Sequence, residues 1–148
     1  MTATESLTRF PPVSMSLQKS DPEAFAHELG KSFREYGFAA ISDHGLDQAL
    51  IDRAYEVAAK FFALPEDVKM KYFIENGGGA RGYTPFGKEI AKDAQHVDLK
   101  EFWHTGRKLP ADSKYRATMK DTPVVDEVPE FDAATYAFYT EMDEFGRD

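Results

Sequence analysis

The chain has 148 residues, of which 42% are hydrophobic and 14% aromatic, and its formal net charge is −8. This length and apolar content suit one packed domain and exclude a disordered chain. The acidic balance and the lack of any basic run argue against nucleic acid or an anionic membrane surface as a partner. Because there is no cysteine, a metal site would need His and carboxylate ligands.

Neither a membrane span nor a secretory signal is predicted. No stretch approaches the ~20 apolar residues that a spanning helix requires. Met1–Phe10 is polar and lacks the apolar segment of a signal peptide. We therefore expect a cytoplasmic protein.

The first part of the chain predicts a strand, a helix and a second strand. Phe10–Leu17 alternates apolar and polar residues after a proline pair, which is typical of a short edge strand. Asp21 and Pro22 suit the start of a helix, and Gly37 suits its end. Phe38–Ser42 predicts a short buried strand. The apolar stripe expected on the helix is Phe25, Leu29, Phe33 and Tyr36.

A turn and two further helices are predicted next. Asp43–Gly45 could suggest an acid-base pair, but we favour a turn in which His44 bonds to the backbone and Gly45 is left-handed. Asp47 caps the second helix, and Pro65–Tyr72 forms a third, short one. The wide apolar face of the second helix is Leu50, Ile51, Ala54, Val57, Ala58, Phe61 and Phe62.

Regular structure is sparse in the middle of the chain. Asn76–Gly82 predicts a loop without the Lys-Ser/Thr of a phosphate site, and Tyr83–Gly87 continues it irregularly. Asp98–His104 predicts a strand, and Pro110–Pro129 predicts a connection that wraps the surface. A last helix begins near Glu130 and looks interrupted by the end of the sequence. Its apolar face is Phe131, Ala134, Phe138, Met142 and Phe145.

Four segments in this order resemble the isopenicillin N synthase-like dioxygenases. None is specific alone, but their shared order makes coincidence improbable. The resemblance runs from about Phe10 to the end of the sequence. The segments are Gly37–Leu46, Phe61–Tyr72, Ala80–Gly87 and Asp98–Trp103.

The resemblance implies an α+β fold and an oxidoreductase. Helices and short strands would form the lead-in to a double-stranded β-helix, the jelly-roll core of the family, and that core would be mostly absent here. Residues 1–148 would then be a truncated non-haem dioxygenase amino-terminal domain without its catalytic domain. The parent enzyme would hydroxylate, desaturate or cyclise a small molecule with Fe(II) and 2-oxoglutarate.

The family's own ligand pattern is not evident in this chain. The resemblance implies a His-x-Asp pair and a distant His for iron, and an Arg-x-Ser for 2-oxoglutarate, but no Arg-x-Ser occurs. His96 and Asp98 spell His-x-Asp, yet His104 would lie roughly 20 Å further along an extended strand. His27 and His44 lie upstream, which reverses the family's order. We expect no metal site, no tight cofactor binding and no turnover by this chain alone.

Arg81 and Tyr83 are the candidate substrate-binding residues. They occupy the Arg/Gly-Tyr segment that the resemblance places near the mouth of the active site. Arg offers a planar donor to carboxylates, and Tyr a ring with a polar tip. The alternative is that Arg81 is a solvated loop charge and Tyr83 a packing residue.

Two other functions stay open. The chain could act alone as a binding or interaction module or be a truncated gene product, and it could be a small metalloprotein that uses His96 and Asp98. An open strand edge at Leu99–His104 and the uncovered final helix predict self-association of an isolated chain.

Overall fold

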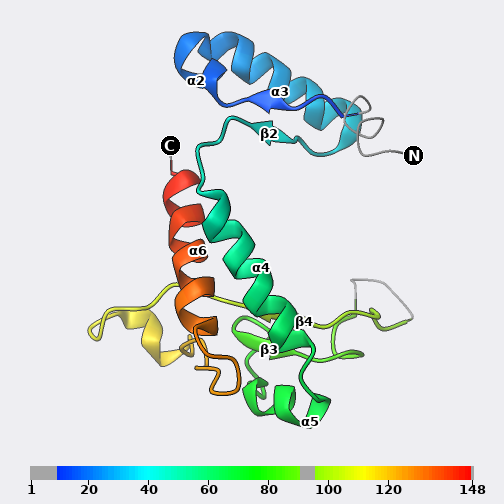
Figure 1. The fold of residues 1–148 in the computed structure, drawn as a ribbon, viewed down its shortest axis with the longest axis vertical. Coiled ribbons are helices and arrows are strands. Elements are labelled where there is room, and N and C mark those ends of the chain that lie inside the picture. Colours follow the sequence, from blue (N-terminus) through cyan, green and yellow to red (C-terminus); the bar gives the residue numbers. More distant parts are fainter. Residues whose placement is uncertain (1–9, 91–95, 148) are drawn as a thin grey trace. The chain divides into compact units, whose positions relative to one another are not determined.

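The computed structural model describes residues 10–90 and 96–147, which divide into two compact units (Figure 1). The first unit ends at Leu46 and the second begins at Asp47. The polar start that was considered as a signal peptide lies, apart from Phe10, outside the described residues.

The first unit pairs two very short strands beside two helices. β1 (Val13–Ser14) pairs with β2 (Ile41–Ser42) in parallel, and Val13 lies opposite Ile41. Between them run α2 (Ser16–Ser20) and α3 (Pro22–Tyr36). Parallel strands need such a crossover, and the helices provide it.

The predicted ends of α3 are confirmed. The Asp21 side chain accepts a hydrogen bond from Ala24 N at 3.0 Å, and Pro22 is the first helical residue. Gly37 ends the helix with φ 79°, a left-handed conformation that glycine adopts without steric cost.

Three predictions for this unit were wrong in extent. The first strand is two residues long because Ser14 Oγ accepts a bond from Ser16 N, which favours the helical turn of α2. The second strand is likewise confined to Ile41–Ser42. The apolar stripe of α3 is poorly covered, since Phe33 is 55% exposed and the buried residue of this helix is Ser32. Two-residue strands are too short to cover a four-turn helix.

The second unit is built on two antiparallel helices, α4 (Gln48–Phe62) and α6 (Phe131–Phe145), which lie side by side (Figure 1). The predicted cap of α4 is confirmed, because Asp47 accepts a hydrogen bond from Ala49 N at 2.9 Å. The buried core of the unit consists of Val57, Phe61, Tyr72, Tyr83, Val125, Val128, Phe131 and Ala134.

A two-stranded ribbon packs beneath these helices. The predicted third helix is α5 (Glu66–Lys69) followed by the 3₁₀ turn η1 (Met70–Tyr72). β3 (Gly82–Thr84) then pairs antiparallel with β4 (Phe102–His104). The prediction that the segment after the glycine loop is irregular was wrong for Tyr83 and Thr84, because both residue types favour strands and β4 lies alongside as a partner.

The connection before α6 is partly internal. It contains a 3₁₀ helix, η2 (Lys114–Ala117), and its Val125 and Val128 enter the core. The prediction that this segment only wraps the surface was therefore wrong for its last part. The segment is rich in proline and charged residues, and its two core valines belong to no periodic apolar pattern. Its sequence therefore does not indicate that they are buried.

Burial decreases along α6. Phe131 and Ala134, at its start, are buried, whereas Met142 is 40% exposed. The predicted apolar face exists, but its second half is only partly covered, since Phe138 and Phe145 are half-buried and Met142 is exposed.

Candidate functional site

The β3–β4 ribbon presents two faces that differ in chemistry. Tyr83 lies opposite Trp103 on one face, and Thr84 lies opposite Phe102 on the other. Because strand side chains alternate, Glu101 joins the first face and His104 joins the second. We call the first the core face (Tyr83, Glu101, Trp103) and the second the open face (Thr84, Phe102, His104).

The core face carries a buried ionic network. Lys69 Nζ, from α5, donates to Glu101 Oε2 at 2.7 Å, and the Tyr83 hydroxyl donates to the same oxygen at 2.5 Å. Lys69 also donates to the carbonyl of Phe62 at 3.3 Å. The Lys69 and Glu101 side chains are only 9% and 16% exposed, so this pair is largely removed from water.

This environment shifts the pKa of two groups. Burial, and then the bond to Glu101, raises the pKa of Tyr83. Burial alone would raise the pKa of Glu101, but the hydrogen bonds from Lys69 and Tyr83 outweigh it, and the pKa is lowered. The network is therefore a carboxylate held between an ammonium and a protonated phenol.

An apolar groove of about 610 Å³ lies beside this network. Both donors to Glu101 bond to Oε2, so within the described residues no donor occupies Oε1, and Glu101 lines the groove. The groove walls come from α4, α6 and the β4 region, and they are Ala54, Tyr55, Ala58, Phe62, Glu101, Phe102, Trp103, His104, Thr105, Phe131, Thr135, Phe138, Tyr139 and Met142.

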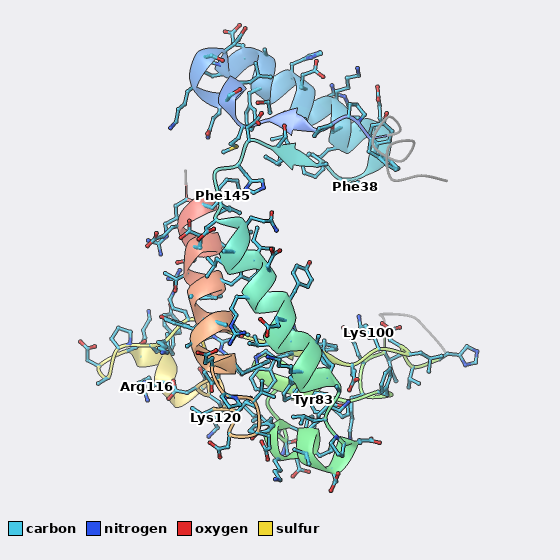
Figure 2. All side chains as sticks on the ribbon, viewed as in Figure 1. Phe38, Tyr83, Lys100, Arg116, Lys120 and Phe145 are labelled. Carbon is cyan, nitrogen blue, oxygen red and sulfur yellow. The ribbon has the colours of Figure 1, made fainter. Side chains whose placement is uncertain are left out.

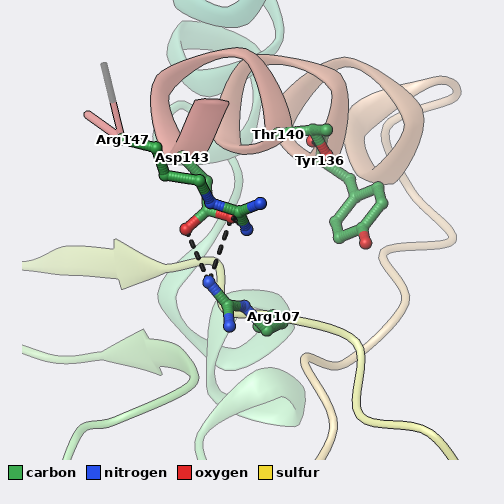
Figure 3. A network of polar contacts seen from close by, with 5 residues as sticks. All are labelled: Arg107, Tyr136, Thr140, Asp143 and Arg147. Atoms are coloured by element: carbon green, nitrogen blue, oxygen red, sulfur yellow. Dashed lines mark hydrogen bonds and ion pairs between the residues drawn. The ribbon is translucent and has the colours of Figure 1, made fainter. Parts of the chain in front are cut away.

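The segment after β4 is tied to the end of α6 by charge. Arg107 donates to both oxygens of Asp143, at 2.7 and 3.0 Å, and Arg147 donates to Asp143 at 2.5 Å (Figure 3). The hydrogen bond from Arg107 has the largest effect and lowers the pKa of Asp143. Burial raises this pKa, but the hydrogen bond from Arg147 acts against burial, and the pKa is lowered overall. This contact is solvent-exposed, since the Arg107 side chain is 56% exposed.

The open face lines a second, smaller pocket of about 280 Å³. The glycine turn covers it, and His104 Nδ1 lies 2.5 Å from the carbonyl oxygen of Gly79. The Thr84 hydroxyl is buried there, and no hydrogen-bond partner reaches it within the described residues. The pocket is lined by Phe73, Ile74, Asn76, Gly78, Gly79, Thr84, Lys88, Glu89, Phe102 and His104.

The two predicted substrate-binding residues lie apart. Tyr83 is 1% exposed and belongs to the core. Figure 2 labels it near the lower end of α4. Arg81 directly precedes β3, donates to the carbonyl of Ala80 at 2.6 Å and lines a pocket of about 130 Å³, and its Nε is buried without a hydrogen-bond partner in the described residues. Its guanidinium packs against Gly106, where no side chain could fit. Their contact with a substrate stays a prediction.

The histidines of the sequence have separate roles. The predicted turn at His44 is confirmed, since its Nδ1 accepts from Leu46 N at 3.1 Å and Gly45 is left-handed with φ 72°. His96 is exposed, and Asp98 pairs with Lys100 at 3.2 Å. In residues 10–90 and 96–147, no three His, Asp or Glu side chains gather in a way that could hold a metal ion.

Sequence reasoning missed the residues that carry most of the site chemistry. Lys69 and Glu101 read as ordinary helix and strand charges, and only their joint burial distinguishes them. Thr84 and His104 could have been found from strand alternation, but this required knowing that Gly82–Thr84 pairs with Phe102–His104.

A family model described as "non-haem dioxygenase in morphine synthesis N-terminal" matches residues 10–127. The chain belongs to this family. The relatives and the structural neighbour place it in the 2OG-Fe(II) oxygenases, and the match covers their amino-terminal region. The suspected resemblance is therefore confirmed.

Named relatives agree with this assignment. A 1-aminocyclopropane-1-carboxylate oxidase of Dictyostelium discoideum is 42% identical over 100 residues, which are 67% of this chain and 27% of the relative. The 2-oxoglutarate-dependent dioxygenase citB of Monascus ruber is 31% identical over 123 residues, 80% of this chain and 36% of the relative. Both proteins are named as oxidative enzymes.

A solved structure shows the same fold. The crystal structure of a 2OG-Fe(II) oxygenase family protein from Caulobacter crescentus matches with a TM-score of 0.76 and 50% identity, over 93% of this chain and 45% of that chain. The predicted mixture of helices and strands is confirmed. The absence of a jelly-roll core stays a prediction.

The chain spans 23% to 36% of the length of the curated relatives it matches. The family implies an iron centre, but the side chains in the described part of the chain do not assemble the three-residue ligand set such a centre needs. None of the helices in that part is long and apolar enough to cross a bilayer.

Proposed function

We propose that this chain is the amino-terminal part of an Fe(II)- and 2-oxoglutarate-dependent oxygenase that hydroxylates, desaturates or cyclises a small organic molecule. The family match over residues 10–127 carries the proposal. The remainder of such an enzyme would supply iron, 2-oxoglutarate and the reacting centre. This chain would form one wall of the substrate pocket and a rigid support for the catalytic part.

The apolar groove supports the proposal that a separate catalytic part packs against this chain. It is about 610 Å³ in volume and is lined by aromatic and aliphatic side chains of α4, α6 and β4, which a free-standing protein would normally cover. The Caulobacter crescentus structure extends over more than twice the length matched here, because the match covers 45% of it. We propose that the catalytic part of the same enzyme fills the groove.

Glu101 gives this groove a polar anchor. Glu101 lines the groove, and Lys69 and Tyr83 hold its carboxylate in place through Oε2, so no donor of the described residues bonds to Oε1. We propose that a backbone amide or a basic side chain of the covering part donates to this second carboxylate oxygen. A rigid anchor of this kind fixes the register of two packed parts.

Arg81 and Tyr83 enter the proposal in different ways. Arg81 is half-buried at the end of the glycine loop, and its guanidinium lines a small pocket where we propose that a substrate carboxylate meets it. Tyr83 is covered in the described unit and would contribute by holding Glu101, with any direct contact to substrate depending on a change of its surroundings.

A chimeric enzyme tests the proposal. Residues 1–148 would replace the matching 45% of the Caulobacter crescentus protein, and 2-oxoglutarate binding and succinate formation would be measured with Fe(II). We expect the chimera to bind 2-oxoglutarate and form succinate, and the 148-residue chain alone to do neither. Succinate formation by the chain alone would contradict the proposal that the remainder of the enzyme supplies the reacting centre.

The control is the unmodified Caulobacter crescentus protein. If that protein binds 2-oxoglutarate and the chimera is folded but does not, this chain is not an interchangeable amino-terminal part and the proposal is wrong. The mass of the natural protein, compared with 16.7 kDa for 148 residues, gives a second test. A mass near 16.7 kDa would favour the alternative of a stand-alone interaction module.

A further inference from the structure

The strand β4 lies at the edge of its ribbon. β3 has a neighbour on each side, because it pairs with β4 and its Tyr83 forms a bridge to Phe73. β4 has only β3 as a strand partner in the described part of the chain. The main-chain groups of β4 that point away from β3 form no backbone hydrogen bond with residues 10–90 or 96–147. We call this side of β4 the free edge.

The apolar groove runs along the free edge. Side chains alternate along a strand, so a groove that faced one side of the ribbon would be lined by every second residue of β4. Residues 101–105 all line the groove of about 610 Å³, whereas no residue of β3 lines it. The groove therefore lies beside β4, on the side away from β3, and an occupant reaches the main chain of β4 as well as its side chains.

The composition of the free edge favours pairing. Exposed edges are usually guarded by proline, lysine or a bulge. Residues 101–105 contain no proline or lysine, and two of them are the strand-forming aromatics Phe102 and Trp103. The one carboxylate, Glu101, is held by Lys69 and Tyr83. This composition is typical of a strand that is paired on both sides.

Packing holds the free edge in place. The Trp103 ring lies 4.9 Å, centroid to centroid, from the rings of both Phe61 and Phe131. Trp103 Nε1 also donates to Thr105 Oγ1 at 3.1 Å. A strand that is fixed in this way loses little conformational freedom when it gains a partner, which favours binding.

The occupant of the groove has to satisfy the backbone groups that it buries. A buried N–H or C=O without a partner costs free energy comparable to a lost hydrogen bond. A helix bonds its own backbone internally and would leave the free edge unpaired, whereas an extended segment pairs with it. Residues 101–105, at ~3.3 Å per residue, offer roughly 16 Å for such a contact, close to an ordinary strand length.

On the basis of the proposed function, we propose that an extended segment of the catalytic part adds to the ribbon as a further strand along the free edge of β4. The Caulobacter crescentus oxygenase, of which this chain matches 45%, has the length to supply the segment. The side chains of the segment alternate between the groove, where Phe138 and Met142 receive apolar groups, and the smaller pocket beside Phe102 and His104. Backbone pairing fixes the register of the two parts.

Hydrogen–deuterium exchange tests the added strand. The amides of β4 are followed at residue resolution in the 148-residue chain, at a concentration where it is monomeric, and in the chimera with the Caulobacter crescentus catalytic part. Amides bonded to β3 should exchange slowly in both proteins. The alternate amides, at the free edge, should exchange at least about ten-fold more slowly in the chimera, the effect of one hydrogen bond. Equal exchange in the two proteins would overturn the proposal.

Backbone contacts separate an added strand from any other cover. A paired strand brings its backbone protons next to those of β4, and NMR of the chimera detects them as nuclear Overhauser effects. Slow exchange without such contacts would show that a helix or side chains cover the edge, and would overturn the proposal. Slow exchange only in a concentration-dependent dimer of the 148-residue chain would assign the free edge to a second copy instead.

A variant in the groove locates the contact. Ala58 lines the groove from α4, so Ala58→Trp should fill the groove and abolish the slow exchange at the free edge of the chimera. Ala59→Trp is the matched control, because Ala59 is the next residue of α4, is exposed and does not line the groove. Circular dichroism checks that both variants are folded. Equally slow exchange in the two folded variants would contradict a strand in the groove.

Binding of 2-oxoglutarate by the chimera is measured separately. A chimera that binds 2-oxoglutarate but leaves the free edge unprotected would overturn the added strand and keep the proposed function. A folded chimera that protects the free edge but does not bind 2-oxoglutarate would contradict the proposed function and support the added strand.

Discussion

Glu127 shows how one side chain at the edge of the core can make the stability of the fold depend on pH. It accepts hydrogen bonds from Lys71, at 2.8 Å, and from the Tyr72 hydroxyl, which also accepts from Asp126 N at 3.1 Å. The bond from Lys71, and then that from Tyr72, lowers the pKa of Glu127 from 4.5 to about 2.

A lowered pKa predicts acid sensitivity. The folded protein holds Glu127 ionised, so its contribution is complete above the unfolded pKa of 4.5 and is lost as the pH falls towards about 2. In the Glu127→Gln variant the free energy of unfolding should therefore fall less between pH 4.5 and about 2 than in the wild type, and Lys71→Met should have part of this effect. Urea midpoints at roughly pH 6 and about pH 3 measure the effect. An unchanged slope in both variants would contradict it.

Gly82 is a residue whose missing side chain is required. It has φ of 72°, and a Cβ there would lie 2.5 Å from the carbonyl oxygen of Tyr72 and 3.0 Å from Pro123. Backbone atoms cannot move aside as a flexible side chain can.

Gly82→Ala should therefore be much more destabilising than a change that costs only backbone strain. Gly78→Ala is the matched control, because Gly78 has φ of 61° and a Cβ there would meet no atom of the described residues within 4 Å. That change should cost about 1–2 kcal/mol. Urea unfolding compares the two free energies of unfolding. Equal losses would mean that the close approach to Tyr72 relaxes without cost.

At the scale of elements, the Lys69–Glu101–Tyr83 network joins α5, β3 and the start of β4. Three separate segments are fixed through one carboxylate oxygen. A buried ion pair contributes little net stability, but removal of one partner leaves a charge without compensation. The network therefore acts as a constraint on geometry more than as a source of stability.

Lys69→Met should lower the free energy of unfolding by about 3–5 kcal/mol. The double variant Lys69→Met/Glu101→Leu should recover much of this loss, because no charge stays buried. Arg107→Met is the control, since it breaks a solvent-exposed pair and should lower the free energy of unfolding far less. Chemical denaturation of the wild type, the two single variants and the double variant measures these free energies of unfolding. If Lys69→Met and the double variant lose equal stability, an uncompensated buried charge is not the cause.

For the whole molecule, the groove between α4, α6 and β4 dominates the expected behaviour in solution. Phe138 and Met142 line it, and Met142 is 40% exposed. An apolar surface of this kind favours association when its proper partner is absent.

The isolated 148-residue chain should therefore self-associate as its concentration rises. Met142→Glu should shift the chain towards the monomer, because it places a charge in the groove. Val124→Glu is the control, since Val124 is 68% exposed and lies outside the groove. Sedimentation equilibrium measures the effect. A wild-type chain that stays monomeric at high concentration would contradict the prediction.

Local patterns in the sequence were sufficient for several features. The caps at Asp21 and Asp47, the left-handed Gly37 and the turn at His44 each depend on neighbours within a few residues. The order of the four family segments identified the oxygenase family, because order along a chain is itself a sequence property.

Only the tertiary structure decided the candidate site. Pairing of Gly82–Thr84 with Phe102–His104 joins segments about twenty residues apart, and it alone directs Tyr83 into the core and Thr84 towards the open pocket. The same pairing buries Glu101 beside Lys69, which is 32 positions away in the chain. Side-chain direction, burial and ion pairing across such separations depend on register and packing, and no local pattern encodes them.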